Sequence, residues 1–205
     1  MIIRELNVDD LTKVAEVHQS AFRGSALSKL GKEVVRRYYE WQIKGPNECY
    51  AIGAFKNEKL IGFCFSGIFR DSLSGFLNKN KGYLITRLMT HPWLIFNPII
   101  TNRISLAMKT IKKARSININ YQQKIKPTTF SILSIATDPK LQNQGVGKEL
   151  MKKCEERSIA MGIYLMRLTV HIDNIKAIHF YQNLGWEKKL SEKGDWNGKM
   201  IKTLQ

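Results

Sequence analysis

Apolar and polar positions near the start of the chain predict one short strand followed by two helices. Residues 2–6, with Ile2, Ile3 and Leu6, are predicted to form a short strand. An apolar stripe with helical spacing follows it, made of Leu11, Val14, Ala15, His18 and Phe22. Asp9 lies just ahead of this stripe, and we expect its carboxylate to cap the first helix by accepting free amide hydrogens. A second helix is predicted over residues 32–43, ended by Gly45 and Pro46.

Two apolar runs over residues 50–55 and 60–65 flank a polar loop of residues 56–59, which is typical of a β-hairpin. Residues 72–127 carry Met, Leu and Ile at mixed spacing, and we expect an insertion of helices whose number the pattern leaves open. The apolar stretch over residues 88–101 contains Pro92 and Pro98 and is shorter than the roughly 20 residues of a membrane-spanning helix. It is interpreted either as a buried insertion helix or as a surface that contacts a membrane or a partner.

The pattern is clearer from residue 129 onward. Residues 130–137 are rich in β-branched residues and predict a buried strand, which Asp138 and Pro139 end. A helix is expected from Gly145 to near Gly162, and strict alternation over residues 164–171 predicts another strand.

A further helix over residues 174–184 ends at Gly185, and weaker strands follow over 186–190 and 199–204. This order of elements indicates a mixed α/β fold, in which helices cover a sheet. We expect a single domain over residues 1–205, with the helical insertion at about 72–127.

Composition narrows the class of protein. The chain has 33 Lys and Arg against 17 Asp and Glu, a formal net charge of +16, so an anionic partner is expected: nucleic acid, a membrane surface or a phosphorylated small molecule. A hydrophobic content of 43% excludes a disordered chain. The three cysteines are odd in number and widely spaced, which fits a reducing compartment, and the histidines lack metal-ligand spacing. No metal is therefore expected. Because the first residues also lack the apolar core of a signal peptide, a cytoplasmic location is expected.

The most informative motif is the loop between the buried strand and the next helix. Its residues are Gln142, Asn143, Gln144, Gly145, Val146, Gly147 and Lys148. Two glycines allow close approach of a ligand, and the first amides of a helix are unpaired and carry the positive end of its dipole, so a pyrophosphate would fit here. Neither the P-loop nor the dinucleotide-binding fingerprint matches, since Glu149 and Leu150 stand where those motifs require other residues.

The surroundings of this loop supply a resemblance. The pattern Gln-x-x-Gly-x-Gly after a buried strand is followed by a further strand and by Asn174, Ala177, Tyr181, Gly185 and Trp186 at fixed intervals. Together they resemble the GNAT superfamily of acyl-CoA N-acyltransferases over roughly residues 1–70 and 128–204. The resemblance implies a mostly antiparallel sheet of six to seven strands, splayed between the fourth and fifth strands and flanked by helices.

The resemblance also implies a cofactor site. Acetyl-CoA would lie in the splayed cleft, with backbone groups of Ile135, Ala136 and Thr137 pairing with its pantetheine arm. The amides of residues 142–148 would bind the pyrophosphate, and Asn174 would form a hydrogen bond with the arm. Tyr181 would stand near the sulfur and act as general acid, although the alternative of a core aromatic remains. The base is left open: His171 is the named candidate, beside Glu48, Asp138 and a water chain.

The leading hypothesis is therefore an N-acetyltransferase that transfers acetyl from acetyl-CoA to a primary amine by direct attack. The acceptor is expected to be an amino sugar or other small amine, with a protein N-terminus as the alternative, whereas polyamines would be repelled by the basic chain. The rival is a catalytically idle basic module that binds a membrane surface or nucleic acid through residues 109–115 and 124–126. For the enzyme we expect no nucleic-acid partner and no membrane span, with peripheral membrane contact left open, and either a monomer or a homodimer.

Overall fold

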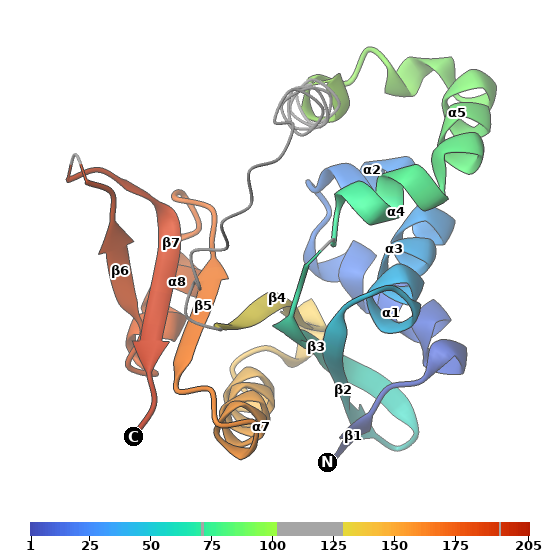
Figure 1. Ribbon diagram of the computed structural model, residues 1–205. Coiled ribbons are helices and arrows are strands. Elements are labelled where there is room, and N and C mark those ends of the chain that lie inside the picture. Colours follow the sequence, from blue (N-terminus) through green and yellow to red (C-terminus); the bar gives the residue numbers. More distant parts are fainter. Residues whose placement is uncertain (71, 102–128, 193) are drawn as a thin grey trace. The chain divides into compact units, whose positions relative to one another are not determined.

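The computed structural model describes residues 1–70, 72–101, 129–192 and 194–205. Contacts divide the chain into two compact units. The first, which we call the sheet unit, comprises residues 1–6, 48–69 and 127–205, and the second, the helical unit, comprises residues 7–47 and 70–126. The two are described separately, and their elements are labelled in Figure 1.

The sheet unit carries seven strands in one sheet, in the order β1-β2-β3-β4-β5-β7-β6. Their bounds are Ile2–Glu5 (β1), Glu48–Lys56 (β2), Lys59–Ile68 (β3), Phe130–Thr137 (β4), Leu165–Thr169 (β5), Glu187–Leu190 (β6) and Trp196–Thr203 (β7). All neighbouring strands are antiparallel except β4 and β5, which are parallel. The predicted mixed α/β fold with a mostly antiparallel sheet is confirmed.

The β2–β3 hairpin is longer and its turn is tighter than the sequence pattern indicates. The ladder runs as far as Lys56 opposite Lys59, so only Asn57 and Glu58 form the turn. Both have positive φ, +48° and +61°, which is the geometry of a two-residue turn that matches the twist of the flanking strands. Lys56 and Lys59, the two ends of the polar loop that the pattern indicates, therefore belong to the strands.

The sheet divides between β4 and β5. These strands pair only at Phe130 with Met166 and at Ser131 with Arg167, whereas β5 pairs with β7 over its whole length. The β3–β4 register also shifts, leaving Leu133 of β4 without a partner residue on β3. Such a bulge bends and twists the strand that carries it. The predicted splay between the fourth and fifth strands is confirmed, and we call this opening the fork.

Helices α7 (Val146–Ala160) and α8 (Ile175–Gln182) supply the core of the sheet unit. One hydrophobic cluster joins Leu150 of α7, Ile178 and Tyr181 of α8 and Met166 and Met200 of the sheet. The end of α8 is fixed by Gly185 at φ +81° and by a hydrogen bond from the amide of Trp186 to the carbonyl of Tyr181. The core therefore holds α8, and with it Tyr181, at a fixed place against the sheet.

The helical unit contains α1 (Leu11–Ala21), α2 (Ala26–Leu30), α3 (Lys32–Lys44), α4 (Ser74–Lys79) and α5 (Lys81–Thr90), with 3-10 turns at Val8–Asp10 (η1) and Pro92–Leu94 (η2). The prediction that Asp9 caps the first helix is wrong. Asn7 Oδ1 accepts from the amides of Asp9 and Asp10, and the Asp10 carboxylate accepts from the amide of Asn7. This capping box holds η1, which leads directly into α1.

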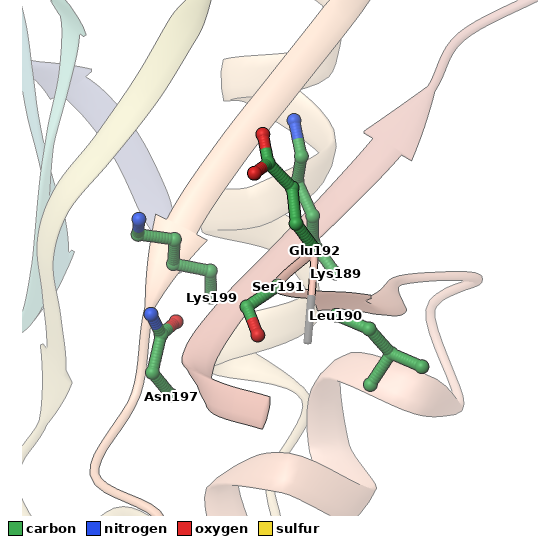
Figure 2. A pocket seen from close by; sticks show the side chains of 6 residues that line it. All are labelled: Lys189, Leu190, Ser191, Glu192, Asn197 and Lys199. Carbon is green, nitrogen blue, oxygen red and sulfur yellow. The ribbon is translucent and has the colours of Figure 1, made fainter. Parts of the chain in front are cut away.

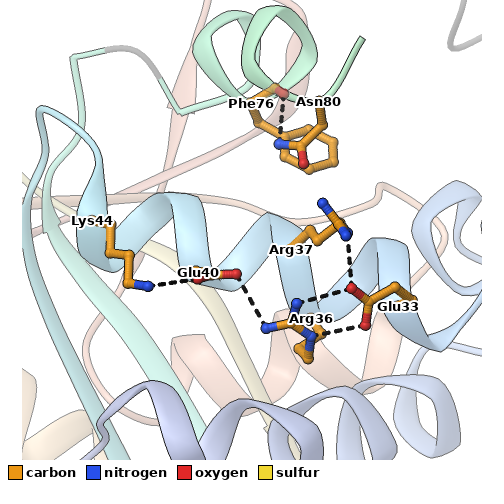
Figure 3. A network of polar contacts seen from close by, with 7 residues as sticks. All are labelled: Glu33, Arg36, Arg37, Glu40, Lys44, Phe76 and Asn80. Carbon is orange, nitrogen blue, oxygen red and sulfur yellow. Dashed lines mark hydrogen bonds and ion pairs between the residues drawn. The ribbon is translucent and has the colours of Figure 1, made fainter. Parts of the chain in front are cut away.

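The part of the insertion that the structure describes packs on α3. Gln42 Nε2 donates to the carbonyl of Ser72 at 3.1 Å, and the rings of Tyr38 and Phe76 meet edge to face. On α3, Glu33 pairs with Arg36 and Arg37, and Glu40 pairs with Arg36 and Lys44 (Figure 3). These ion pairs are partly exposed and lie within a single helix, so each contributes only a few tenths of a kcal/mol (about 0.3–0.5).

The apolar stretch over residues 88–101 is not one buried helix, because α5 ends at Thr90 and η2 follows. Leu94 and Ile100 are buried, whereas Trp93 and Phe96 are exposed. In the described ranges, no helix combines the length and the apolar character that crossing a membrane requires. The basic segments 109–115 and 124–126 lie outside the described residues.

Candidate functional site

The loop from β4 to α7 has the backbone geometry of an anion cradle. Asp138 accepts a hydrogen bond from the amide of Lys140 and holds the 3-10 turn Pro139–Leu141 (η3). Asn143 has φ +64°, and Gly145, the residue before α7, has φ +79°. Positive φ at these two positions turns the chain sharply into the helix.

The first amides of α7 are free to bind a ligand. The earliest amide that donates within the helix turn is that of Glu149, to the carbonyl of Gly145. None of the described residues accepts a hydrogen bond from the amides of Val146, Gly147 or Lys148. Residues 142–145 and Lys148 are exposed. Unpaired amides at the positive end of a helix of this length are suited to a phosphate group.

One edge of β4 is also free. Within the β3–β4 ladder the amide of Asp138 donates to the carbonyl of Ile61. This bond fixes which residues of β4 direct their backbone N–H and C=O groups toward β3 and which direct them away. Ala136 therefore directs its backbone groups toward β3, whereas Ile135 and Thr137 direct theirs toward the fork. Because β5 pairs with β4 only up to Ser131, none of the strands in the described residues occupies that side. Of the three β4 residues assigned to the pantetheine arm, the geometry favours Ile135 and Thr137.

Asn174 is the N-cap of α8. Its Oδ1 accepts a hydrogen bond from the amide of Ala177 at 3.2 Å. Its Nδ2 group donates to none of the described residues. The side chain can therefore hold the helix with its oxygen and donate to a ligand with its nitrogen.

Tyr181 lies within the core cluster and is 9% exposed. Its ring packs on Phe180 and Trp186, and its hydroxyl has no hydrogen-bond partner among the residues described. Burial, and to a lesser extent the neighbouring thiol of Cys64, raises the pKa of the Tyr181 hydroxyl above its ordinary value. Cys64, which belongs to the same hydrophobic cluster as Tyr181, is the ladder partner of Ile135 on β4.

The candidate bases differ in their surroundings. His171 follows β5 and is largely exposed, with Nδ1 3.4 Å from the Asp173 carboxylate. Asp138 is engaged by the amide of Lys140 and lies 3.8 Å from Lys59 Nζ. Glu48 is exposed at the first position of β2. Of these, His171 and Asp138 lie at the ends of the strands that border the fork.

A cavity of about 460 Å³ lies beside the fork. Ser131 and Leu133 line it from β4, and Arg167 and Thr169 line it from β5. Arg167 Nε donates to Ser131 Oγ at 2.7 Å, at the last paired position of the two strands. The sequence pattern predicts only that Arg167 lies in an alternating strand. Its partner on the neighbouring strand, Ser131, is distant in the chain, so the local sequence does not indicate this contact.

Two lysines extend the cationic lining. Lys189 of β6 and Lys199 of β7 line this cavity and also an adjacent one of about 470 Å³, formed by the β6–β7 hairpin. Figure 2 shows both side chains reaching to the same side of that hairpin, with Glu192 near Lys189. The described residues that line the cavity at the fork include no Asp or Glu.

Comparisons with known proteins agree with this geometry. The family model described as the acetyltransferase (GNAT) family matches residues 11–186. No curated protein matches the chain. The PaiA N-acetyltransferase of Thermoplasma acidophilum, solved with coenzyme A, is 17% identical at a TM-score of 0.58, and 98% of each chain is covered. The ribosomal-protein-S18-alanine N-acetyltransferase of Escherichia coli is 16% identical at a TM-score of 0.55, covering 99% of this chain and 92% of that one.

A third solved structure, Naa20 of Chaetomium thermophilum with a bisubstrate analogue, is 14% identical at a TM-score of 0.56, covering 100% of this chain and 87% of that one. At these identities the structures establish the fold, and the family match, which extends over most of the sequence, establishes the family. The resemblance inferred from the loop and from the Asn174–Trp186 pattern is confirmed. The chain belongs to the acetyltransferase (GNAT) family.

Proposed function

We propose that the protein transfers the acetyl group of acetyl-CoA to the nitrogen of a primary amine. The observation that carries this proposal is the fork: β4 has an unpaired edge, and it leads into a helix whose first amides are also unpaired. A pantetheine arm carries amides that can pair with a strand edge, and coenzyme A carries the pyrophosphate that a helix N-terminus favours. The unpaired strand edge and the unpaired helix amides follow one another along the chain, so each part of coenzyme A has a binding site.

The residues divide the binding between them. Backbone groups of Ile135 and Thr137 pair with the arm, and the Asn174 Nδ2 group donates to it from the other side of the fork. The amides of residues 142–148 hold the pyrophosphate, with the exposed ammonium of Lys148 beside them.

The reaction follows from these placements. The amine has a pKa of about 10 and must lose a proton before its nitrogen attacks the thioester carbon. His171 is the proposed acceptor of that proton. As the C–N bond forms, the amide of Ile135 is placed to stabilise the carbonyl oxygen. The C–S bond then breaks, and the leaving thiolate takes a proton from the Tyr181 hydroxyl. The second proton that the nitrogen loses as the amide forms passes through solvent to the Tyr181 oxygen and restores the neutral phenol.

The raised pKa of Tyr181 suits this last step in one respect. The residue stays a neutral phenol throughout the neutral and mildly alkaline range, so the proton is available whenever the thiolate leaves.

Two assays test the proposal. The thermal stability of the protein is measured with acetyl-CoA, with anionic phospholipid vesicles and with duplex DNA. Stabilisation by acetyl-CoA, followed by release of free thiol when amines are added, supports the enzyme. Salt-sensitive binding to vesicles or DNA without any effect of acetyl-CoA would instead favour an idle basic module.

A matched pair of variants locates the cofactor. Gly145 and Gly162 lie at opposite ends of α7, both with positive φ and both with open space where a Cβ would point. Replacing either with Ala should destabilise the fold by a similar amount, about 1 kcal/mol. Only Gly145→Ala is expected to weaken acetyl-CoA binding, by about tenfold. Equal affinity in the two variants would contradict the placement of the pyrophosphate.

A further inference from the structure

Arg167 is held in position at the point where the sheet divides. Its ladder partner Ser131 is buried and accepts the hydrogen bond from Nε. Its two Nη groups contact none of the described residues through a hydrogen bond or ion pair. Anchored through one nitrogen, the guanidinium presents its remaining donors to the cavity at the fork, in the planar arrangement that suits a carboxylate or a phosphate.

Lys199 and Lys189 reach the same cavity through the ladder. Lys199 is the partner of Thr169 in the β5–β7 pairing, and β6 lies beside β7 on its other side. Among the described residues neither ammonium forms an ion pair, whereas Lys202 of the same strand β7 pairs with Glu155. Glu192 lines only the adjacent hairpin cavity. The cavity at the fork thus collects three cations, of which Arg167 is the one fixed in place.

We propose that the acceptor is a small primary amine that carries a carboxylate or a phosphate, bound by Arg167 with Lys189 and Lys199. This inference rests on the proposed acetyl transfer and names its second substrate. A volume of about 460 Å³ lies within the usual range of small-molecule sites. An acceptor without an anionic group would bring only its ammonium to a site that repels it.

The cations have a second effect on the same substrate. A neighbouring positive charge disfavours the protonated form of an amine and lowers its pKa. An acceptor anchored by its anion therefore holds its amine where the neutral, attacking form is favoured. This reduces the demand on the base, for which the largely exposed His171 is the candidate.

The test uses two matched pairs of amines with acetyl-CoA: aminoethyl phosphate against ethanolamine, and β-alanine against aminopropanol. Free thiol release gives kcat/KM for each. We expect the anionic member of at least one pair to be favoured by about tenfold or more. The phosphate and carboxylate pairs distinguish which anion the site takes. The preference should decline at an ionic strength of about 1 M, where the screening length is about 3 Å.

Variants assign the preference to residues. Arg167→Gln should bring the two members of the favoured pair within about threefold, and Lys199→Gln should reduce the ratio in the same direction. Lys188→Gln is the control, because it removes the same charge from the adjacent position on β6, where Lys188 lies over the Trp196 ring and not in the cavity. Ser131→Ala tests positioning: it should lower the preference while leaving the affinity for acetyl-CoA unchanged.

The outcomes separate this inference from the proposed function. Thiol release with neutral and anionic amines alike, or a preference that survives both Arg167→Gln and Lys199→Gln, overturns the anionic acceptor and leaves acetyl transfer standing. If no amine releases thiol, the proposed transfer fails, and ligand binding then tests whether the cavity is an anion site. Greater thermal stabilisation by aminoethyl phosphate or β-alanine than by its neutral partner supports an anion site, provided that the difference is lost in Arg167→Gln and kept in Lys188→Gln. The absence of that difference overturns it.

Discussion

Replacing Tyr181 with Phe removes one oxygen atom and separates the catalytic from the structural role of this side chain. The ring packs 5.2 Å from Phe180 and 6.1 Å from Trp186, centroid to centroid, and Phe keeps both contacts. Because the hydroxyl has no partner among the described residues, its removal leaves none of them unsatisfied. We therefore expect the free energy of unfolding to change by less than about 1 kcal/mol.

Tyr181→Phe should affect turnover far more than the free energy of unfolding. General acid catalysis contributes about 10²–10⁴-fold, and the low end applies because a thiolate, with a thiol pKa of about 8.5, leaves more easily than an alkoxide. A loss of about 10²-fold corresponds to about 2.7 kcal/mol in the transition state. Affinity for acetyl-CoA should hardly change, since the hydroxyl acts on the sulfur only as the bond breaks.

The assay is thiol release with a saturating amine, measured from pH 7 to pH 9.5 for the wild type and the variant. Because the pKa of Tyr181 is raised above its ordinary value of 10, its ionisation should cause no alkaline decline in this range, and the ratio of the two rates should stay constant. Tyr164→Phe is the control, since that tyrosine is exposed. An unchanged rate at every pH, or a loss of folding that accounts for the lost activity, would refute the role of general acid.

Three further predictions concern the fold. Asn7→Ala should cost about 1 kcal/mol of stability in chemical denaturation, because it removes the cap, whereas Asp9→Ala should cost little; the reverse order would restore Asp9 as the cap. Burial lowers the pKa of His18 from 6.5 to about 4, so the unfolded chain binds this proton first and stability should fall by about 3 kcal/mol between pH 7 and pH 4. His18→Gln should flatten that decline, and an equal slope in the variant would exclude His18 as its source. Burial also raises the pKa of Cys49 to about 12 and that of Cys64 well above its ordinary value, so Ellman's reagent should react slowly with native protein at pH 8 and fully in denaturant; rapid native labelling would contradict this.

The elements with a strong local period could be predicted from the sequence. The strand over residues 130–137 and the helix that begins after Gly145 have the expected bounds, because a run of β-branched residues and a glycine before a helix act over a few neighbours. The cap of the first helix was misplaced because Asn7 and Asp9 both satisfy the same rule. Only the 3-10 turn that precedes α1 decides between them. The short helix Ala26–Leu30 has too few turns for a periodic pattern.

Some features of the site could likewise be predicted from the local sequence, and others could not. The loop and Asn174 follow local patterns, whereas the bulge at Leu133 lies in a strand without a regular alternation of apolar and polar residues, so the sequence does not reveal the shift of register. The pairing of Arg167 with Ser131, and the approach of Lys189 and Lys199, depend on the order β4-β5-β7-β6. That order joins residues far apart in the chain, and no window of sequence contains it.

The short pairing of β4 with β5 has a consequence for hydrogen exchange. The amides of Ile135 and Thr137 face the fork and lie beyond the last β4–β5 pair, so they should exchange with solvent much faster than that of Ala136, which lies in the same strand but is bonded to β3. A bound arm that pairs with this edge would act as a temporary eighth strand beside the seven of the sheet, and should slow exchange at alternate residues only. Ligand binding would then be recorded along β4 as a two-residue periodicity in protection.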